Sequence, residues 1–261
     1  MTSLISFTLT EKEMRLKKAL DKQVSLGYNE FIKSEEWFLA LCLVRSWIMT
    51  NNFQVISDFL TEQFSSLNGD DCSIKDDRFY NVALIGRKKD NALVDGKVKS
   101  YTINTICDLD KYKQEIITIC DALKVRAYIS VNYKSHKQVT LNTLLKYTNN
   151  IAQDCFSNSR GIYDSTVAQF ADSKKQLWII DVDKDDSFDK SVDELTDLYI
   201  KTIESCKPYK KIVAVIPTKS GKHIITHPFD SSDFYLKIGE LAKLGSNLIK
   251  KNDVTLLYEN T

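Results

Sequence analysis

Residues 177–183 read LWIIDVD, a short apolar run that ends in two acids. Successive side chains point to opposite faces of a strand, so we expect Ile179, Asp181 and Asp183 on one face. The opposite face is then apolar throughout and suited to packing under helices. The pattern predicts a half-covered strand whose open face carries two carboxylates.

The residues that follow this strand predict a βαββαβ unit. An apolar stripe at helical spacing comes first, then two β-like runs joined by the turn Ser220-Gly221, a second helix and a last apolar run. This order is the split βαβ, ferredoxin- or RRM-like arrangement, and it makes the fold class mixed α/β (α+β). The expected elements are a strand at Leu177–Asp183, a helix at Ser191–Ser205, strands at Lys211–Pro217 and Lys222–His227, a helix at Phe234–Leu244 and a strand at Val254–Tyr258.

The chain before this unit is expected to form two further parts. Residues 1–75 predict a helical N-terminal extension, with helices from about Thr10, after Ser34 and across Val55–Phe64. Residues 76–160 predict an α/β unit, which forms the core together with the ferredoxin-like unit over residues 161–261. In the α/β unit we expect strands at Tyr80–Ile85, Ser100–Ile106 and Arg126–Asn132, helices near Leu109–Leu123 and Leu141–Ile151, and the polar stretch Ser157–Lys175 at its end.

Composition excludes several classes of protein. The 36 Lys and Arg residues balance 35 Asp and Glu residues, which argues against binding through bulk positive charge. The six cysteines occur singly, so neither a zinc ribbon nor a thioredoxin motif is expected. No signal peptide is recognised, and the apolar run Trp37–Met49 is interrupted by Arg45 and too short to span a bilayer. We expect a cytoplasmic protein with reduced thiols and no membrane partner.

The predicted sheet brings acids and a histidine together. In a βαββαβ unit the first and third strands are antiparallel neighbours, so Asp181 and Asp183 are expected to lie beside His223. Two carboxylates at positions i and i+2 suit hard divalent cations such as Mg²⁺ or Mn²⁺, which prefer oxygen ligands. Such ions orient a triphosphate, neutralise its charge and activate an attacking hydroxyl.

The hairpin before His223 is a candidate phosphate-binding site. Lys219, Ser220 and Lys222 surround a glycine turn, where backbone N–H groups and ammonium groups favour anions. The imidazole of His223 is expected to donate a hydrogen bond to a phosphate oxygen.

Two other interpretations stay open for these residues. Taken singly, the acids suit a solvated strand end, the lysines a solvated hairpin and His223 a satisfied core histidine. The apolar strand followed by Asp-x-Asp also resembles haloacid-dehalogenase phosphatases. That family has a threonine where this chain has Asp185, and its sheet is parallel.

Two segments together resemble a known family. Trp178-Ile-Ile-Asp-Val-Asp183 and Pro217-Thr-Lys-Ser-Gly-Lys-His-Ile-Ile-Thr226 are similar to motifs I and II of the archaeo-eukaryotic primase superfamily. The likeness covers about residues 78–258 and is greatest to the compact primase-polymerase forms of phages and mobile elements. A phage-encoded protein of this kind would act in the host cytoplasm.

The resemblance implies an activity and a set of roles. It implies a template-dependent nucleotidyltransferase that uses Mg²⁺ or Mn²⁺, with Asp181 and Asp183 as metal ligands and His223 as a nucleotide contact. The family has a third acid in a later motif, for which Asp230 and Asp253 are the candidates here. The partners implied are a single-stranded template and nucleoside triphosphates. A separate hypothesis is that the N-terminal helices, which the likeness does not include, bind a helicase or another replication protein.

A second hypothesis keeps the fold without the reaction. If the third acid is missing, the chain is a catalytically degenerate accessory protein of replication that binds nucleic acid or nucleotide.

Candidate template contacts come from the residues before the metal site. Arg87, Arg126 and Lys134, with Tyr128 between the last two, end or follow predicted strands and suit a phosphate backbone and a stacked base. Residues 163–165 (Tyr-Asp-Ser), shortly before the first acidic strand, are expected to line the site.

Overall fold

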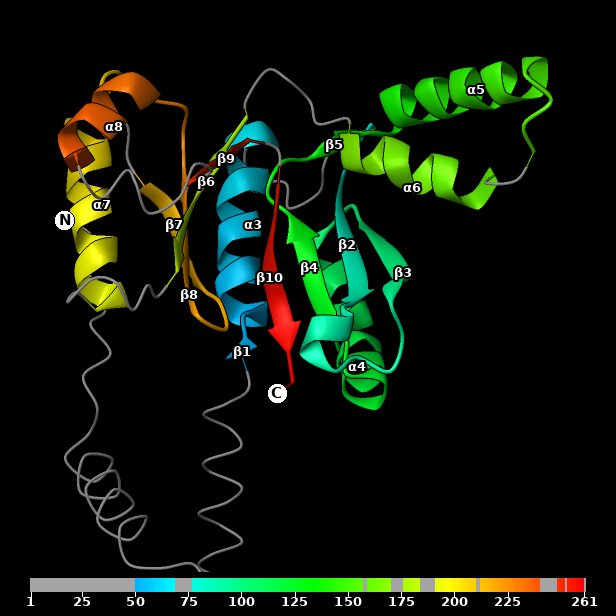
Figure 1. The fold of residues 1–261 in the computed structure, drawn as a ribbon, viewed down its shortest axis with the longest axis horizontal. Coiled ribbons are helices and arrows are strands. Elements are labelled where there is room, and N and C mark those ends of the chain that lie inside the picture. Colours follow the sequence, from blue (N-terminus) through cyan, green and yellow to red (C-terminus); the bar gives the residue numbers. More distant parts are fainter. Residues whose placement is uncertain are drawn as a thin grey trace, which may run out of the picture. The chain divides into compact units, whose positions relative to one another are not determined.

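The structure is a computed structural model, shown in Figure 1. It describes residues 50–68, 77–156, 159–169, 176–183, 191–209, 212–239, 248–251 and 253–260. All of them belong to one compact unit, Ile48–Thr261. The helices predicted from Thr10 and after Ser34 lie outside the described residues.

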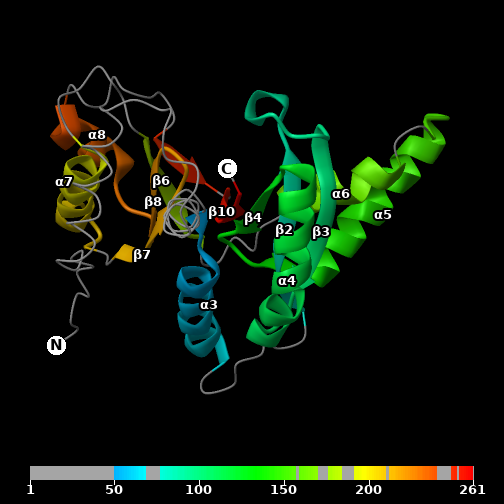
Figure 2. The ribbon, with the colours of Figure 1, turned by 90° about the horizontal axis from the view of Figure 1, so that it is seen from below.

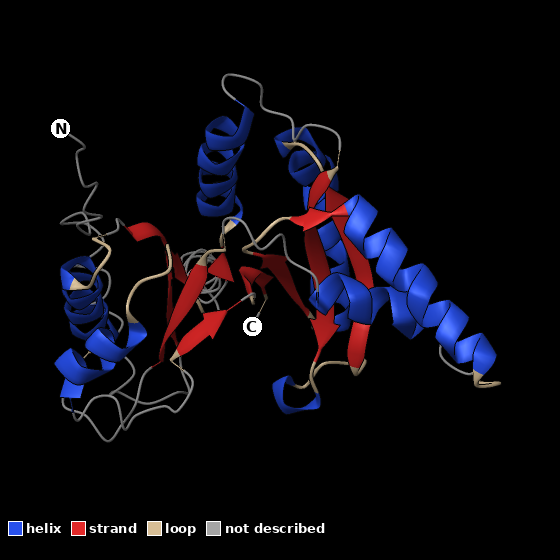
Figure 3. Ribbon diagram, turned by 90° about the horizontal axis from the view of Figure 1, so that it is seen from above, coloured by secondary structure: helices blue, strands red, loops and turns tan. Residues whose placement is uncertain are grey.

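The described strands fall into two antiparallel sheets, drawn in red in Figure 3. The first has the order β1-β10-β4-β2-β3, with β5 paired to β2 off this path. Its strands are β1 (Thr50–Asn51), β2 (Arg78–Gly86), β3 (Gly96–Ile103), β4 (Arg126–Ser130), β5 (Lys134–Ser135) and β10 (Val254–Glu259). The three strands predicted for the α/β unit are therefore present and form one sheet.

The second sheet has the order β7-β8-β6-β9, with every neighbouring pair antiparallel. Its strands are β6 (Trp178–Asp183), β7 (Ile212–Pro217), β8 (Gly221–Thr226) and β9 (Ile249–Lys251). Helix α7 (Val192–Ser205) lies between β6 and β7 in the chain, and α8 (Ser231–Ile238) lies between β8 and β9. The acidic strand β6 is thus a central strand, flanked by β8 and β9.

The last predicted strand forms but joins the other sheet. Residues 254–258 were expected beside β6, whereas β10 pairs with β4 and β1 of the first sheet. The place beside β6 is taken by β9, which the sequence did not reveal. The side chains of β10 from Thr255 to Glu259 are all buried, which suits an interior strand, while the lysines of β9 suit a sheet edge.

The helices that connect these strands have clear start signals. A capping box formed by Thr105 and Asp108 begins α4 (Ile106–Leu123), and a second one formed by Ser191 and Glu194 begins α7. The sequence missed α6 (Ser159–Gln169), which lies inside the predicted polar stretch. Its buried side chains are few, at Ile162, Thr166 and Val167, so its helical period is weak. The remaining helices are α3 (Phe53–Asn68), α5 (His136–Ala152) and the short 3₁₀ turn η1 (Lys88–Asp90).

The two faces of the second sheet belong to different hydrophobic clusters. Ile180, Val182 and Ile224 pack with α7 and α8, as predicted for the helix-covered face. The other face was expected to be open, but Ile179 and Ile225 are fully buried in the cluster that contains α3 and the first sheet. Figure 1 shows α7 and α8 on one side of β6, β7 and β8, with α3 on the other.

Helices α3 and α4 supply many of the buried residues in the cluster that contains the first sheet. Phe53, Leu60 and Phe64 of α3 share it with the buried residues of β2, β3 and β4. Helix α3 precedes the boundary predicted near residue 75, yet its apolar face belongs to this core. Helix α4 packs along the same sheet (Figure 2). The acidic face of β6 therefore lies against a packed core at one end and carries its polar residues at the other.

Candidate active site

The strand register places the predicted acid and histidine side by side. Asp181 of β6 is the direct partner of His223 on β8, and Asp183 is the partner of Gly221. The Nε2 atom of His223 lies 3.3 Å from Oδ1 of Asp181. Two residues that lie far apart in the sequence are thus joined by antiparallel pairing, as the sequence predicts.

Asp181 is held as a carboxylate by two neighbours. Its second oxygen, Oδ2, accepts a hydrogen bond of 2.5 Å from Nζ of Lys250, and only 18% of its side chain is exposed. Burial alone would raise the pKa of Asp181, but the hydrogen bonds from His223 and Lys250 outweigh it and lower the pKa to about 2. The group is therefore ionised throughout the physiological range.

Lys250 is a site residue that the sequence analysis missed, as is Thr255. Lys250 lies on the edge strand β9, opposite Ile179, so its side chain shares the face of Asp181. Burial alone would lower the pKa of Lys250, but the hydrogen bond to Asp181 and the charges of Asp181, Asp253 and Asp183 raise it. A run of Ile-Lys-Lys is too short to be recognised as a strand, so no signal in the sequence pointed to this lysine.

His223 is fixed at both ring nitrogens. Its Nδ1 lies 3.0 Å from Oγ1 of Thr255, which belongs to β10 in the other sheet. When Nε2 donates to Asp181, Nδ1 of the neutral ring accepts from this hydroxyl. An acid, a histidine and a threonine in series resemble a nucleophilic triad, but Thr255 is 0% exposed and no substrate reaches its hydroxyl.

Asp183 is the exposed acid of the pair. Its Oδ1 accepts a hydrogen bond of 3.0 Å from Oγ of Ser220, so the hairpin serine contacts the acidic strand directly. At Gly221 an added Cβ would lie 1.8 Å from the carbonyl oxygen of Val182. Glycine is therefore required there, because β8 approaches β6 closely. The same close approach places Ser220 within hydrogen-bond distance of Asp183.

The rest of the predicted phosphate hairpin is less open to an anion. The N–H of Gly221 donates to Oγ1 of Thr218. Lys222 forms an ion pair with Asp193 at the start of α7, on the helix-covered side of the sheet. Lys219 reaches the opposite way, with its Nζ 3.3 Å from the buried carboxylate of Glu259.

The two candidates for a third acid lie in different places. Asp230 is the N-cap of α8, where its Oδ1 accepts from the N–H groups of Ser232 and Asp233. It follows the end of β8 that pairs with Trp178, away from Gly221. Asp253 lies between β9 and β10, and its charge acts on Lys250. Asp253 is thus the candidate whose charge acts on the lysine that pairs with Asp181.

The three residues predicted to contact the template lie in different surroundings. Arg126 is tied into a buried ion cluster, with Nη2 at 2.8 Å from Asp90 and 3.0 Å from Glu259. The guanidinium of Arg87 stacks over the ring of Tyr128 at 5.2 Å. Lys134 is only 4% exposed, so it is not placed to follow a strand at the surface. Of the three, Arg87 is the one whose stacked partner and half-exposed position suit a surface contact.

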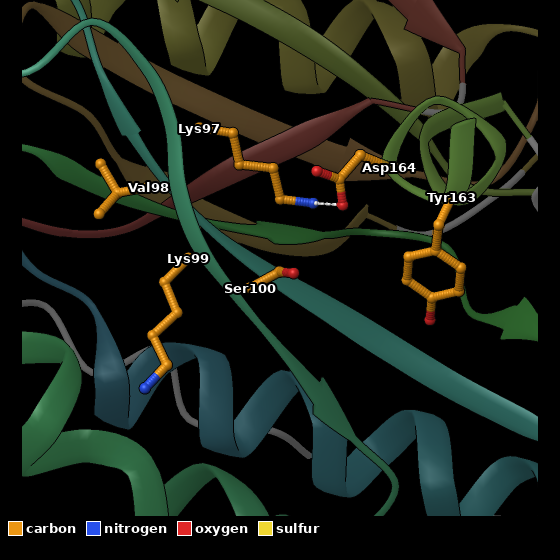
Figure 4. A pocket seen from close by; sticks show the side chains of 6 residues that line it. All are labelled: Lys97, Val98, Lys99, Ser100, Tyr163 and Asp164. Atoms are coloured by element: carbon orange, nitrogen blue, oxygen red, sulfur yellow. Dashed lines mark hydrogen bonds and ion pairs between the residues drawn. The ribbon is translucent and has the colours of Figure 1, made fainter. Parts of the chain in front are cut away.

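The residues predicted just before the acidic strand lie elsewhere. Tyr163 and Asp164 of α6 line a pocket of about 280 Å³ against the edge strand β3, shown in Figure 4. Asp164 forms an ion pair of 2.7 Å with Lys97 in this pocket. Ser165 donates its hydroxyl to the carbonyl of Ile162 within α6. The contacts of these three residues are with α5, α6 and β3, and not with Asp181.

The donor set around Asp181 has the chemistry of a site for a hard cation. Asp181 and Asp183 offer carboxylate oxygens, Asp253 carries a third carboxylate nearby, and Ser220 adds a hydroxyl. Within the described residues, no group of three or more His, Cys, Asp or Glu residues is close enough to hold a metal ion. A divalent cation held by Asp181 and Asp183 would take the rest of its ligands from water or substrate.

Comparison of the chain with protein-family models, with curated proteins and with solved structures found no match. None of the described helices combines the length and apolar character that crossing a membrane requires. The family resemblance accordingly stays a prediction that depends on the two motifs and on the site geometry.

Proposed function

We propose that the protein is a metal-dependent, template-directed nucleotidyltransferase of the primase-polymerase kind, with β6–α7–β7–β8–α8–β9 as a ferredoxin-like βαββαβ catalytic unit. The observation that carries this proposal is the contact between Asp181 and His223 on adjacent central strands. That contact supports the expectation that the two sequence motifs form one site. The strand order of the second sheet is the one such a unit requires.

In this proposal the acids bind the metal. Asp181 and Asp183 hold Mg²⁺ or Mn²⁺, and Asp253 is the third acid in preference to Asp230, whose carboxylate caps α8. The bound ion supplies charge neutralisation for a triphosphate and activation of an attacking hydroxyl. Because the pKa of Asp181 is about 2, this ligand needs no proton removed before it binds a cation.

The histidine and the hairpin are assigned to the nucleotide. His223 is oriented by Thr255, and Ser220 stands beside Asp183 at the hairpin tip. Lys219, half-exposed at the same tip, is the hairpin ammonium on the side of the acids, whereas Lys222 faces α7. For the single-stranded template, Arg87 stacked on Tyr128 is the contact we propose.

The direct test removes the charges of the two acids. In Asp181→Asn with Asp183→Asn we expect incorporation of labelled nucleotides on a single-stranded template with Mn²⁺ to fall by at least about a hundredfold, because the metal loses both carboxylates. Asp197→Asn, an exposed acid on α7, is the matched control and should keep full activity. Thermal unfolding curves should first show that both variants are folded. If the double variant then incorporates nucleotides at the control's rate, the proposal is wrong.

A second candidate function is favoured by one observation. Both oxygens of Asp181 already have partners inside the protein, which suits a module that binds nucleic acid or nucleotide without catalysis. Such a module would still bind a fluorescently labelled single-stranded nucleic acid in the presence of a chelator. It would form no phosphodiester bonds when Mn²⁺ is supplied. The incorporation assay on the wild-type protein separates the two functions.

A further inference from the structure

Lys250 occupies the position in which a cation would meet Asp181. Its Nζ lies 2.5 Å from Oδ2, and this is the carboxylate oxygen that His223 does not contact. Two more carboxylates, of Asp253 and Asp183, act on the same ammonium. Asp181 is the acid that the ammonium contacts directly.

The position of Lys250 is built by the fold. The strand β9 is short and pairs with β6 over Trp178, Ile179 and Ile180, and the carbonyl of Leu248 just before it accepts from the N–H of Asp181. Lys250 is thus the partner of Ile179, two residues before Asp181 on the same face of β6. The side chain of Lys250 therefore extends along the face of β6 toward the acid, whereas Lys251 points the other way and stacks over Trp178. About a third of the Lys250 side chain is exposed, so a displaced ammonium can move into solvent.

We propose that Lys250 is a resident counter-cation of the carboxylate site, and that a divalent ion binds Asp181 in competition with its ammonium. The inference rests on the proposed function, since it requires a cation at Asp181. Two cations cannot share Oδ2 at contact distance, because their mutual repulsion opposes simultaneous binding. Lys250 then keeps Asp181 oriented while the metal is absent, and it weakens metal binding by the strength of the pair it forms.

The proposal makes Lys250 a positioning residue with a distinctive signature. Removing an ordinary ligand or a supporting residue weakens metal binding, whereas removing a competitor strengthens it. The same change removes the partner of Asp181 in the metal-free protein, so it should lower stability without metal and make the protein more responsive to metal.

The experiment titrates the full chain with Mn²⁺ and follows free Mn²⁺ by electron paramagnetic resonance. We expect Lys250→Met and Lys250→Gln to bind Mn²⁺ more tightly than the wild type by about tenfold. The neighbouring Lys251→Met serves as the matched control and should bind like the wild type. In thermal unfolding, saturating Mn²⁺ should raise the midpoint of either Lys250 variant more than that of the wild type. The glutamine variant retains a hydrogen-bond donor and gives a second measurement if the methionine variant does not fold.

Two results would overturn the inference, and they are distinguishable. If the wild type binds Mn²⁺, Asp181→Asn abolishes that binding, and the Lys250 variants bind no more tightly, competition is excluded while the metal site of the proposed function stands. If neither the wild type nor any Lys250 variant binds Mn²⁺, both the inference and the metal-dependent function are wrong.

Discussion

Asp181 and its neighbours illustrate how much one side chain depends on groups from other strands. His223 comes from β8, Lys250 from β9, and Thr255, which orients the histidine, from β10. Period-two alternation predicted the shared face of Asp181 and Asp183, and the motif spacing predicted the histidine. Neither the alternation nor the motif spacing could predict Lys250 or Thr255, because both residues reach the site only through strand pairing that the sequence does not show.

Lys134 gives a prediction about pH. Burial lowers the pKa of Lys134 from its ordinary value of 10.5 to about 8. Between pH 8 and 10.5 the unfolded chain holds a proton that the folded protein has lost, so this residue makes stability rise with pH over that window. Below pH 8 the ammonium is charged in both states, and the folded protein bears the cost of burying it.

The test compares the wild type with Lys134→Met in denaturant unfolding from pH 7.5 to 10.5. Methionine removes the titrating group, so the wild type should gain about 1–3 kcal/mol relative to the variant as pH rises through this window. Lys201→Met, on the exposed side of α7, should run parallel to the wild type. A pH profile of Lys134→Met that also runs parallel to the wild type would contradict the buried-ammonium assignment.

Among the elements, helix starts are encoded locally and can be tested locally. The hydroxyl of Ser191 accepts from the N–H of Glu194, whose carboxylate accepts from the N–H of Ser191 in return. In Ser191→Ala this capping box loses the side-chain acceptor. The unfolding free energy should fall by about 1 kcal/mol, measured by urea denaturation. Ser232→Ala, an exposed serine in the first turn of α8, should change it by less than about 0.5 kcal/mol.

The elements that the sequence predicted well are those with a strong local pattern. Strands β6 and β8 and helix α7 were expected close to their observed bounds, since each combines a clear period with a turn or a cap. Helix α6 and strand β9 were missed for the opposite reason. A helix with few buried side chains and a three-residue strand carry too little periodic signal. Helix α6 packs on the preceding helix α5, and β9 pairs with the distant strand β6.

In the whole molecule, Asn52 joins the two sheets. Its side-chain amide donates to the carbonyl of Pro217 in the second sheet and to that of Leu256 in the first, each at 2.8 Å. The Asn52 residue is 2% exposed, and its bond to Leu256 is buried whereas its bond to Pro217 is partly buried. Water therefore cannot readily replace the amide at the carbonyl of Leu256. Asn52, between β1 and α3, therefore connects the second sheet, which holds the β7–β8 hairpin, to the first sheet, which holds Thr255.

Asn52→Ala should cost about 1–3 kcal/mol of unfolding free energy, because the buried carbonyl of Leu256 and the partly buried carbonyl of Pro217 each lose a donor. Urea denaturation measures the loss, with Asn149→Ala on the exposed face of α5 as the control that should stay near the wild type. Wild-type stability in Asn52→Ala would show that these hydrogen bonds do not hold the sheets together.

The alternation of residues 177–183 and the motif around His223 were sufficient to predict a central acidic strand, its helix-covered face and its histidine neighbour. These follow from local geometry, because a strand turns over its side chains every residue and an antiparallel pair aligns its ends. The assignment of β10 to the first sheet, the burial of the acidic face against α3, and the arrival of Lys250 and Thr255 at the site depend on pairing between distant segments. Long-range pairing is selected by burial over the whole core, which no short stretch of sequence encodes.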